Sequence, residues 1–274
     1  MNNNITVYKP KRGIGGKVRF LAIAAHHDDI EILATDGILR SNKGEGGFVG
    51  VVVTDGSGSA RDGEYAHYTD EMMKRVRVKE QNRAADIGKY QEIIYLNRTS
   101  KDIKNGFNSE VLTDIIEIIL KYQPEIVYTH NLCDKHPTHI GVVMHVIESL
   151  KSLESRKKPL ELYGVEVWKD LDWMVDKNKV VFDVSSAKKM TKKQLLAHRS
   201  QVVGGKRYDT ATIGRRSANA TYYQSHSVDV SDQMIFAMDL LPLINGSVDN
   251  IIAYAKKQIN DFEEEVTSRL SVFK

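Results

Sequence analysis

The first 150 residues alternate short apolar runs with amphipathic segments, and this alternation limits the fold more than any other feature. The apolar runs have the length of buried strands and cover residues 20–24, 48–53, 92–96 and 125–129. The segments between them show helical spacing and cover residues 29–41, 71–87, 108–122 and 136–152. This order predicts an α/β fold with a Rossmann-like, mostly parallel sheet and helices on both faces.

The pattern loosens beyond residue 155. Two more strands and one helix are predicted at residues 163–167, 180–184 and 187–201. Residues 204–227 are polar and lack a clear period, which predicts a long loop, and residues 247–270 predict one or two terminal helices. We therefore interpret residues 1–274 as a single domain, with a core at about 18–201 and a C-terminal, substrate-shaping elaboration at about 202–274.

Composition narrows the class of protein. A net charge of +3 with no large basic cluster argues against a nucleic-acid partner. The N-terminal segment is polar, and no apolar run is long enough to span a bilayer. Because Cys133 is the only cysteine, no intramolecular disulfide can form. We expect a cytoplasmic protein that can form a homo-oligomer.

Two clusters of histidines and carboxylates follow predicted strands. The first is Ala25-His26-His27-Asp28-Asp29, and the second is Asp134-Lys135-His136-Pro137-Thr138-His139. In open α/β sheets, ligands bind beyond the carboxyl ends of the strands. The two clusters are therefore expected to meet at one site.

The residue types in these clusters suit a catalytic metal site. Catalytic zinc takes three protein ligands and a water, whereas structural zinc takes four protein ligands. His26 and Asp29 are three residues apart at a strand-to-helix junction, and His136 and His139 have the same spacing at a predicted helix start. Asp28 lies beside the first pair and could act as a general base.

Each cluster by itself also has a simpler interpretation. Asp28 and Asp29 could cap a helix and interact favourably with its dipole. His27 is expected to be a bystander, and both His130 and His145 are expected to be packed or structural histidines. Only the combination of the two clusters points to a metal.

Taken together, these residues resemble the signatures of the LmbE-like (PIG-L) family of zinc-dependent N-acetylglucosaminyl deacetylases. The family pattern A-H-P-D-D corresponds to residues 25–29, and D-x-H-P-D-H corresponds to residues 134–139. Three weaker matches are the segments Thr54-Asp55-Gly56, Arg77-Val78-Lys79-Glu80 and Ala197-His198-Arg199-Ser200-Gln201. The resemblance covers about residues 18–201.

The resemblance implies a role for each matching residue. It implies Zn²⁺, or another divalent metal, held by His26, Asp29 and His139. It implies catalytic roles for three further residues, which are Asp28 as general base, His136 at the oxyanion or leaving amine, and Asp134 as the group that orients a histidine. It also implies substrate contacts, which we assign to Arg77 and Asp55.

The sequence departs from the family pattern at two positions. His27 stands in place of the family proline, which affects the stiffness of the turn. Thr138 stands in place of the family aspartate, whose charge can pair with the catalytic histidine. A threonine cannot supply that charge, so activity could be reduced.

The expected function is removal of an acetyl group from the nitrogen of an N-acetylated aminosugar, a small-molecule partner. One alternative is another metal-dependent amidohydrolase that acts on a non-sugar amide. A second is a Rossmann-like sugar- or nucleotide-binding protein without catalysis, and a third is a family member of weakened activity. The turn at residues 25–29 has no glycine, which disfavours a dinucleotide site.

Overall fold

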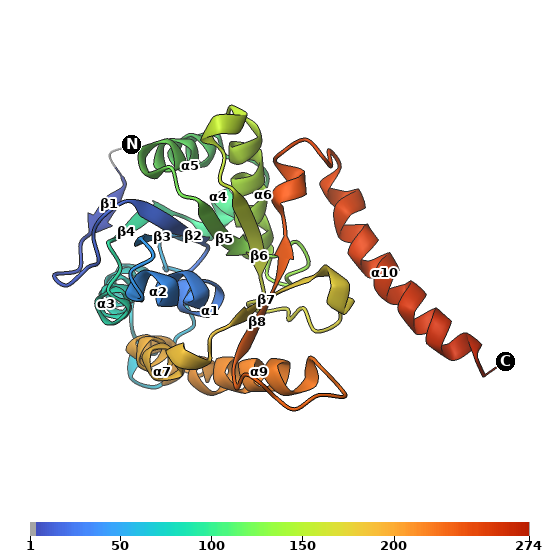
Figure 1. The fold of residues 1–274 in the computed structure, drawn as a ribbon. Helices are drawn as coiled ribbons and strands as arrows, with labels where there is room; N and C mark the ends of the chain where they lie inside the picture. Colours follow the sequence, from blue (N-terminus) through green and yellow to red (C-terminus); the bar gives the residue numbers. More distant parts are fainter. Residues whose placement is uncertain (1–3, 274) are drawn as a thin grey trace.

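The four apolar runs of the first 150 residues form neighbouring strands of one eight-stranded sheet in the computed structural model, which describes residues 4–273 (Figure 1). The strands are β1 (Thr6–Tyr8), β2 (Val18–Ala24), β3 (Gly47–Thr54), β4 (Glu92–Arg98), β5 (Ile126–His130), β6 (Glu161–Val165), β7 (Lys179–Asp183) and β8 (Met234–Asp239). Their order across the sheet is β1-β4-β3-β2-β5-β6-β8-β7.

The middle of the sheet is parallel. Strands β4, β3, β2, β5 and β6 pair in parallel, whereas β1, β8 and β7 are antiparallel additions at the two edges. The chain moves outward from β2 through β3 to β4, then returns to the other side of β2 at β5. The strand order therefore reverses between β2 and β5, which is where open α/β sheets bind ligands.

Helices cover both faces of the sheet (Figure 1). One face carries α4 (Ser100–Lys104), α5 (Ser109–Tyr122) and α6 (Pro137–Lys151). The other carries α1 (Asp29–Leu33), α2 (Thr35–Asn42), α3 (Asp70–Gly88), α7 (Lys188–Ala197) and α9 (Tyr208–Tyr222). The remaining α-helices of the described chain are α8 (Arg199–Val202) and α10 (Ile251–Ser271).

Strand β2 shows why two helical layers are needed. Leu21 and Ile23 belong to one buried apolar cluster, and Phe20, Ala22 and Ala24 belong to a second cluster on the opposite face. Successive side chains of a strand point to opposite faces, so a strand with apolar residues on both faces must be covered on both sides. The predicted α/β class with a mostly parallel sheet is confirmed.

The prediction of a long loop at residues 204–227 is wrong, because α9 occupies most of this segment. The buried positions of α9 are Thr212, Arg216, Asn219 and Ala220, which have helical spacing but are mostly polar. Arg216 and Asn219 are buried through hydrogen bonds to α1 and to Glu166. A method that follows apolar periodicity does not detect such a helix.

Three predicted helix boundaries also differ from the structure. The helix predicted at 29–41 breaks at Ala34 into α1 and α2, and the helix predicted at 187–201 breaks at His198. The helix predicted at 71–87 ends one residue later, at Gly88, and Lys89 adopts the left-handed conformation that ends it. Asn108 caps α5, and Pro137 begins α6.

The C-terminal helix α10 extends away from the rest of the molecule (Figure 1). Ile251 and Tyr254 near its start pack against the main core, but Gln258 is its only buried residue. Within residues 4–273, no helix combines the length and the apolar character needed to cross a membrane. No observation tests whether residues 1–274 form one domain, so that interpretation remains a prediction.

Candidate metal centre and active site

The two histidine clusters lie side by side at the point where the strand order reverses. His26 to Asp29 follow β2 directly, and Asp134 to His139 lie between β5 and α6. Strands β2 and β5 are parallel neighbours, so their carboxyl ends lie at the same edge of the sheet. The expectation that the two clusters meet is therefore correct.

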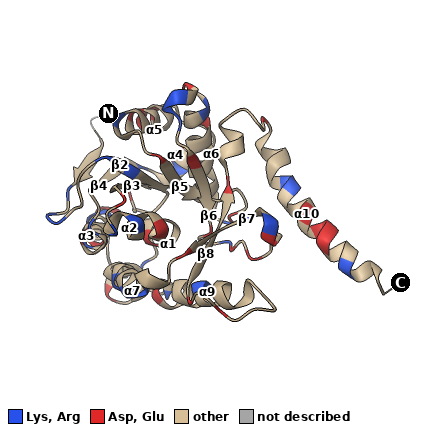
Figure 2. Ribbon diagram, in the orientation of Figure 1, with Lys and Arg blue, Asp and Glu red and all other residues tan. Residues whose placement is uncertain are grey.

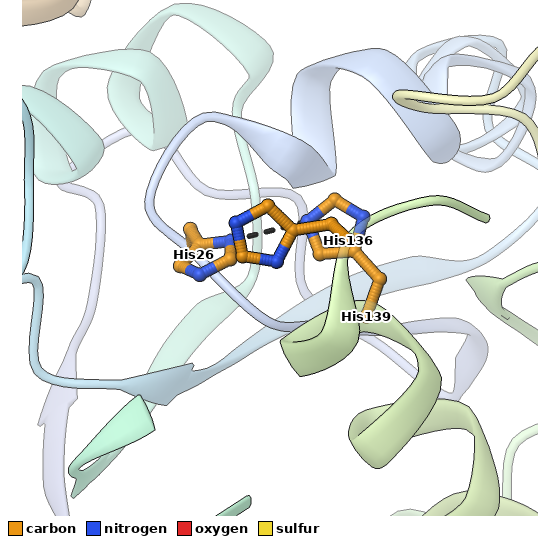
Figure 3. A group of neighbouring side chains, drawn as sticks. All are labelled: His26, His136 and His139. Atoms are coloured by element: carbon orange, nitrogen blue, oxygen red, sulfur yellow. Dashed lines mark hydrogen bonds between the residues drawn. The ribbon is translucent and has the colours of Figure 1, made fainter. Parts of the chain in front are cut away.

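Three of these side chains bring one ligand atom each to a common point. His26 Nδ1 lies 3.1 Å from Asp29 Oδ2 and 3.1 Å from His139 Nε2. Asp29 Oδ2 and His139 Nε2 are 3.3 Å apart. Figure 3 shows the rings of His26 and His139 facing one another, with His136 beside them.

This triangle has the size that a tetrahedral metal ion requires. Ligand atoms about 2.0–2.1 Å from a tetrahedral ion lie roughly 3.3 Å from one another. Two imidazole nitrogens and one carboxylate oxygen are a donor set that catalytic zinc and several other divalent ions accept. His26, Asp29 and His139 can therefore hold a divalent cation.

Asp134 lies beside the ring of His139. Its Oδ2 lies 3.3 Å from His139 Nδ1, on the side of the ring away from His26. The backbone N–H groups of His136 and Trp168 donate to the two oxygens of Asp134 at 3.0 Å each, which fixes the carboxylate. Although burial alone would lower it, Asp29 and Asp134 raise the pKa of His139 to about 9. The carboxylates of Asp29 and Asp134 therefore favour a cation at the ring of His139, whether that cation is a proton or a metal ion.

His130 is also close, but its ring is already engaged. The backbone N–H of Ala25 donates to His130 Nε2 at 2.9 Å, so this nitrogen uses its lone pair within the fold. Burial holds the pKa of His130 well below its usual range. His130 is therefore a neutral, packed residue 3.6 Å from Asp29 rather than a free ligand. This agrees with the expectation from the sequence.

His136 occupies the N-cap of α6. Its Nδ1 accepts a hydrogen bond from the backbone N–H of Thr138 at 3.3 Å, which leaves Nε2 as the protonated nitrogen. Burial, together with the neighbouring His26 and His139, lowers the pKa of His136 to about 4. At neutral pH His136 is therefore an uncharged hydrogen-bond donor.

Asp28 stands in an unusual backbone conformation. Its φ of 99° lies in a region that non-glycine residues rarely adopt, and such strain is concentrated at functional sites. Gln81 Oε1 accepts the backbone N–H of Asp28 at 3.1 Å, and Arg77 lies 3.0 Å from its Oδ2. Burial raises the pKa of Asp28, although Arg77 opposes the rise.

Arg77 and Asp55, the two predicted substrate contacts, already have partners within the protein. Arg77 is buried, pairs with Asp28 and Glu80, and donates to the carbonyl of His27. Asp55 pairs with Lys74 at 3.1 Å. Arg77 still lines the cavity described below, so contact between it and a substrate remains a prediction.

A buried network that the sequence reasoning left without a role supports the first cluster. Glu31 on α1 lies 3.0 Å from His198 Nε2 and accepts hydrogen bonds from Gln81 and Tyr90. Ser200 donates to Glu80 on α3 from both its backbone and its hydroxyl group. The segment 197–201, noted only as a weak family match, thus fastens α7 and α8 to α1 and α3.

A cavity of about 400 Å³ opens above the metal centre, within the range of small-molecule sites. Besides His26, Asp28, Asp29 and His136, its lining includes Gly56, Arg77, Trp168, Gln201, Lys206 and Tyr208. A smaller neighbouring hollow of about 260 Å³ shares Trp168 and Tyr208 with it and adds Arg215. The C-terminal region thus contributes to the cavity through Lys206, Tyr208 and Arg215, whereas Arg216 and Asn219 are buried structural residues.

Comparison with known proteins places this geometry in a family. Residues 21–150 match the PIG-L family, described as GlcNAc-PI de-N-acetylase. The match covers just under half of the chain. It contains all three residues of the metal triangle, and the family resemblance predicted from the motifs is confirmed. The family description names an N-deacetylase, so the predicted enzyme class is supported at the level of the family.

Solved structures confirm the fold. The 4-carboxy-2-hydroxymuconate hydratase GalB of Pseudomonas putida is 17% identical, with a TM-score of 0.64 over 82% of this chain and 97% of that chain. The conserved protein TT1542 of Thermus thermophilus is 17% identical, with a TM-score of 0.63 over 82% and 95%. N,N'-diacetylchitobiose deacetylase of Pyrococcus horikoshii is 18% identical, with a TM-score of 0.60 over 80% and 83%. A search of the curated proteins found no match. Because a hydratase and a deacetylase share this fold, the reaction must be argued from the site.

Proposed function

We propose that this protein is a zinc-dependent hydrolase that removes the acetyl group from an N-acetylated aminosugar. The observation that carries the proposal is the triangle of His26 Nδ1, Asp29 Oδ2 and His139 Nε2 at the floor of a cavity, beside the carboxylate of Asp28. The chemistry that zinc supplies when bound is polarisation of the acetyl carbonyl and acidification of a water.

Asp28 is the proposed general base. It lines the cavity next to the triangle, and burial raises the pKa of its carboxyl group, which makes the carboxylate a better proton acceptor. In amide hydrolysis, water adds to the acetyl carbon, the C–N bond breaks, and acetate and an amine are released. Asp28 takes the proton from the water and can return it to the leaving nitrogen. Arg77 holds the carboxylate in place through its 3.0 Å contact.

His136 is the proposed oxyanion donor. Since its Nδ1 accepts the Thr138 N–H, its Nε2–H is free to donate. A pKa of about 4 means that this donor is a neutral imidazole at pH 7. It can therefore stabilise developing negative charge on the carbonyl oxygen, but it is a weak source of a proton.

The rim of the cavity favours a substrate that carries an anionic group. Lys104 and Lys206 line the cavity, and Lys135 lines its smaller neighbour. Lys135 and Lys206 lie 5.6 Å and 5.2 Å from the ring of Trp168. Within the described residues, these three lysines make no ion pair with a carboxylate of the protein. A phosphate or carboxylate on the sugar or its substituent would complement them.

The deciding experiment measures metal content and amine release together. Wild type and His139→Ala would be assayed on neutral, phosphorylated and carboxylated N-acetylglucosamine derivatives. The proposal expects about one zinc per chain and deacetylation in the wild type, with both lost in the variant. Bound zinc without release of an amine from any sugar would contradict the deacetylase and favour a different reaction on this fold, as in the hydratase.

A second variant tests the preference for an anionic substrate. Lys206→Gln should lower kcat/KM for a phosphorylated sugar by about tenfold and leave the neutral sugar nearly unchanged, because only the charge is removed. Lys188→Gln, a change of an exposed lysine outside the cavity lining, is the matched control. An equal loss of kcat/KM on both sugars would mean that Lys206 does not distinguish an anionic substrate from a neutral one.

A further inference from the structure

The outer surface of α10 and the residues just beyond it carry an apolar stripe that is largely exposed. Its residues are Ile252, Ile259, Phe262, Val266, Leu270 and Phe273, which are 37–87% exposed. Phe262 also meets the ring of Trp173, with 6.5 Å between the ring centroids. The stripe follows a heptad repeat. Its first seam position is occupied, every seven residues, by Ile252, Ile259, Val266 and Phe273. The second seam position, three residues later, is occupied by Ala255 and Phe262. This spacing produces the narrow seam of a coiled coil rather than the broad buried face of a surface helix.

Contacts with the rest of the molecule use a different side of the helix. Asn178 donates to Gln258 Oε1 at 2.9 Å and to Asp261 Oδ2 at 2.7 Å, and Tyr254 packs against the core. On a helix of 3.6 residues per turn, these positions lie roughly a quarter turn or more from the centre of the stripe. Apart from Phe262, which meets Trp173 on one side and is still 39% exposed, the seam is not used in anchoring α10 to its own subunit.

The charges along α10 are arranged unevenly. The first half carries Lys256 and Lys257, and the second half carries Glu263, Glu264 and Glu265, as the blue and red bands of Figure 2 show. An identical helix laid alongside in the opposite direction would bring basic half against acidic half at both ends. A parallel copy would bring like charges together.

We propose that α10 binds α10 of a second copy of this chain as an antiparallel pair. A two-fold axis between Asn260 and Asp261 aligns Ile259 with Phe262 of the second copy and Ala255 with Val266 of the second copy. The same register brings Lys256 next to Glu263 of the second copy, twice by symmetry. This arrangement brings opposite charges together, and its seam is apolar except at the ends, where Arg269, paired with Glu265 of its own helix, faces Ile252 of the second copy.

A membrane surface fits the helix less well. Helices that lie on membranes carry mainly lysine and arginine on their polar face. The acidic residues of α10 outnumber its basic ones, since Asp261, Glu263, Glu264 and Glu265 stand against Lys256, Lys257 and Arg269. A second copy therefore accounts for the stripe and the charges together.

Analytical ultracentrifugation of the full-length chain tests the proposal. At about 1–100 µM, a range that covers interfaces of modest affinity, the wild type should show a monomer–dimer equilibrium. Ile259→Glu should abolish the dimer, because it places a carboxylate in the seam of both helices. Circular dichroism checks that the variant keeps its helix. A wild type that stays monomeric throughout this range would overturn the proposal.

Charge reversal tests the antiparallel orientation and does not depend on the seam variant. Lys256→Glu and Glu263→Lys should each raise the dimer dissociation constant about tenfold, because two attractive pairs become repulsive. The double variant should restore it, since each copy again offers opposite charges. Glu264→Lys, which changes a neighbouring residue on the side away from the seam, should have little effect.

Two results would contradict this orientation or this partner. Failure of the double variant to recover dimerisation would exclude the antiparallel register. A monomeric protein that co-sediments with anionic phospholipid vesicles, and loses this property in Ile259→Glu, would assign the stripe to a membrane surface instead.

Discussion

At the residue scale, Asp28 shows how backbone strain and function coincide. Its φ of 99° turns the chain so that Asp28 and Asp29, adjacent in sequence, reach different partners. Asp29 reaches the two histidines of the metal triangle, and Asp28 reaches Arg77. Strain of this kind persists only where surrounding contacts hold it, and here Gln81 and Arg77 provide them.

Asp28→Asn should lower kcat by about 10²–10⁴-fold, because an amide cannot accept the proton from water. Zinc content should be unchanged, since Asp28 is not part of the triangle. Steady-state kinetics and metal analysis measure the two effects separately. Asp172→Asn, a change of an exposed aspartate, serves as the control. A loss of only a few-fold would reject the proposed role of Asp28.

Thr138→Asp should raise the pH at which His136 loses its proton, and so move the limb of the pH–rate profile that His136 controls to higher pH. The wild-type pKa of His136 is about 4, so its imidazole is neutral at pH 7. A carboxylate beside the ring favours the charged form, so the pKa rises and the imidazolium persists to higher pH. The profile of kcat/KM against pH measures the change. An unaltered profile would show that residue 138 does not control His136.

At the element scale, the short helix α1 depends on the C-terminal elements for its position. Its residue Glu31 pairs with His198 at the break between α7 and α8. Arg216 of α9 donates to the backbone carbonyls of Glu31 and Ile32, which the end of α1 leaves without helical partners. These contacts fix the helix that begins at Asp29.

His198→Ala should destabilise the protein by about 3 kcal/mol, because it leaves the buried carboxylate of Glu31 without one of its hydrogen-bond partners. Urea unfolding monitored by circular dichroism measures the change. Arg199→Ala removes an exposed ion pair with Glu64 from the adjacent position and should cost much less, because solvent screens such a pair. Equal losses in both variants would mean that the Glu31–His198 pair adds no stability beyond an exposed one.

At the scale of the whole molecule, the proposed metal centre joins segments that are distant in sequence. His26 and Asp29 follow β2, and His139 lies on α6. A cation bound by all three ties the two halves of the parallel sheet together across the point where the strand order reverses. Binding that occurs only in the folded state adds to stability.

Zinc at about 100 times its Kd should raise the Tm of chelator-treated protein by about 5–10 °C. His139→Ala should abolish this rise, because it removes one of the three ligand atoms. His145→Ala is a matched control on the same helix, since His145 bonds to Asn108 and Gly141 away from the triangle. Differential scanning fluorimetry with and without zinc measures the shift. A rise that survives in His139→Ala would place the metal elsewhere.

Much of the fold could be predicted because its signals are local. The apolar runs at β2 to β5 and the helices between them are visible in the spacing of single residues. The residues of the metal triangle could be proposed because both clusters directly follow strands, and parallel strands place such positions at one edge of the sheet. These features depend on neighbours within about ten residues in the chain.

Other features depend on contacts between distant segments, which only the tertiary structure decides. The helix α9 is stable because buried Arg216 and Asn219 find partners on α1 and at Glu166, so apolar spacing could not reveal it. His130 and His139 are both close to Asp29, but the Ala25 N–H occupies a ring nitrogen of His130 while Asp134 leaves Nε2 of His139 available. The sequence determined which residue types gather at the sheet edge, because strand ends are local features. The fold decided which of them can offer a ring nitrogen to a metal, because the group that engages Nε2 of His130 is the backbone of Ala25, 105 residues away in the chain.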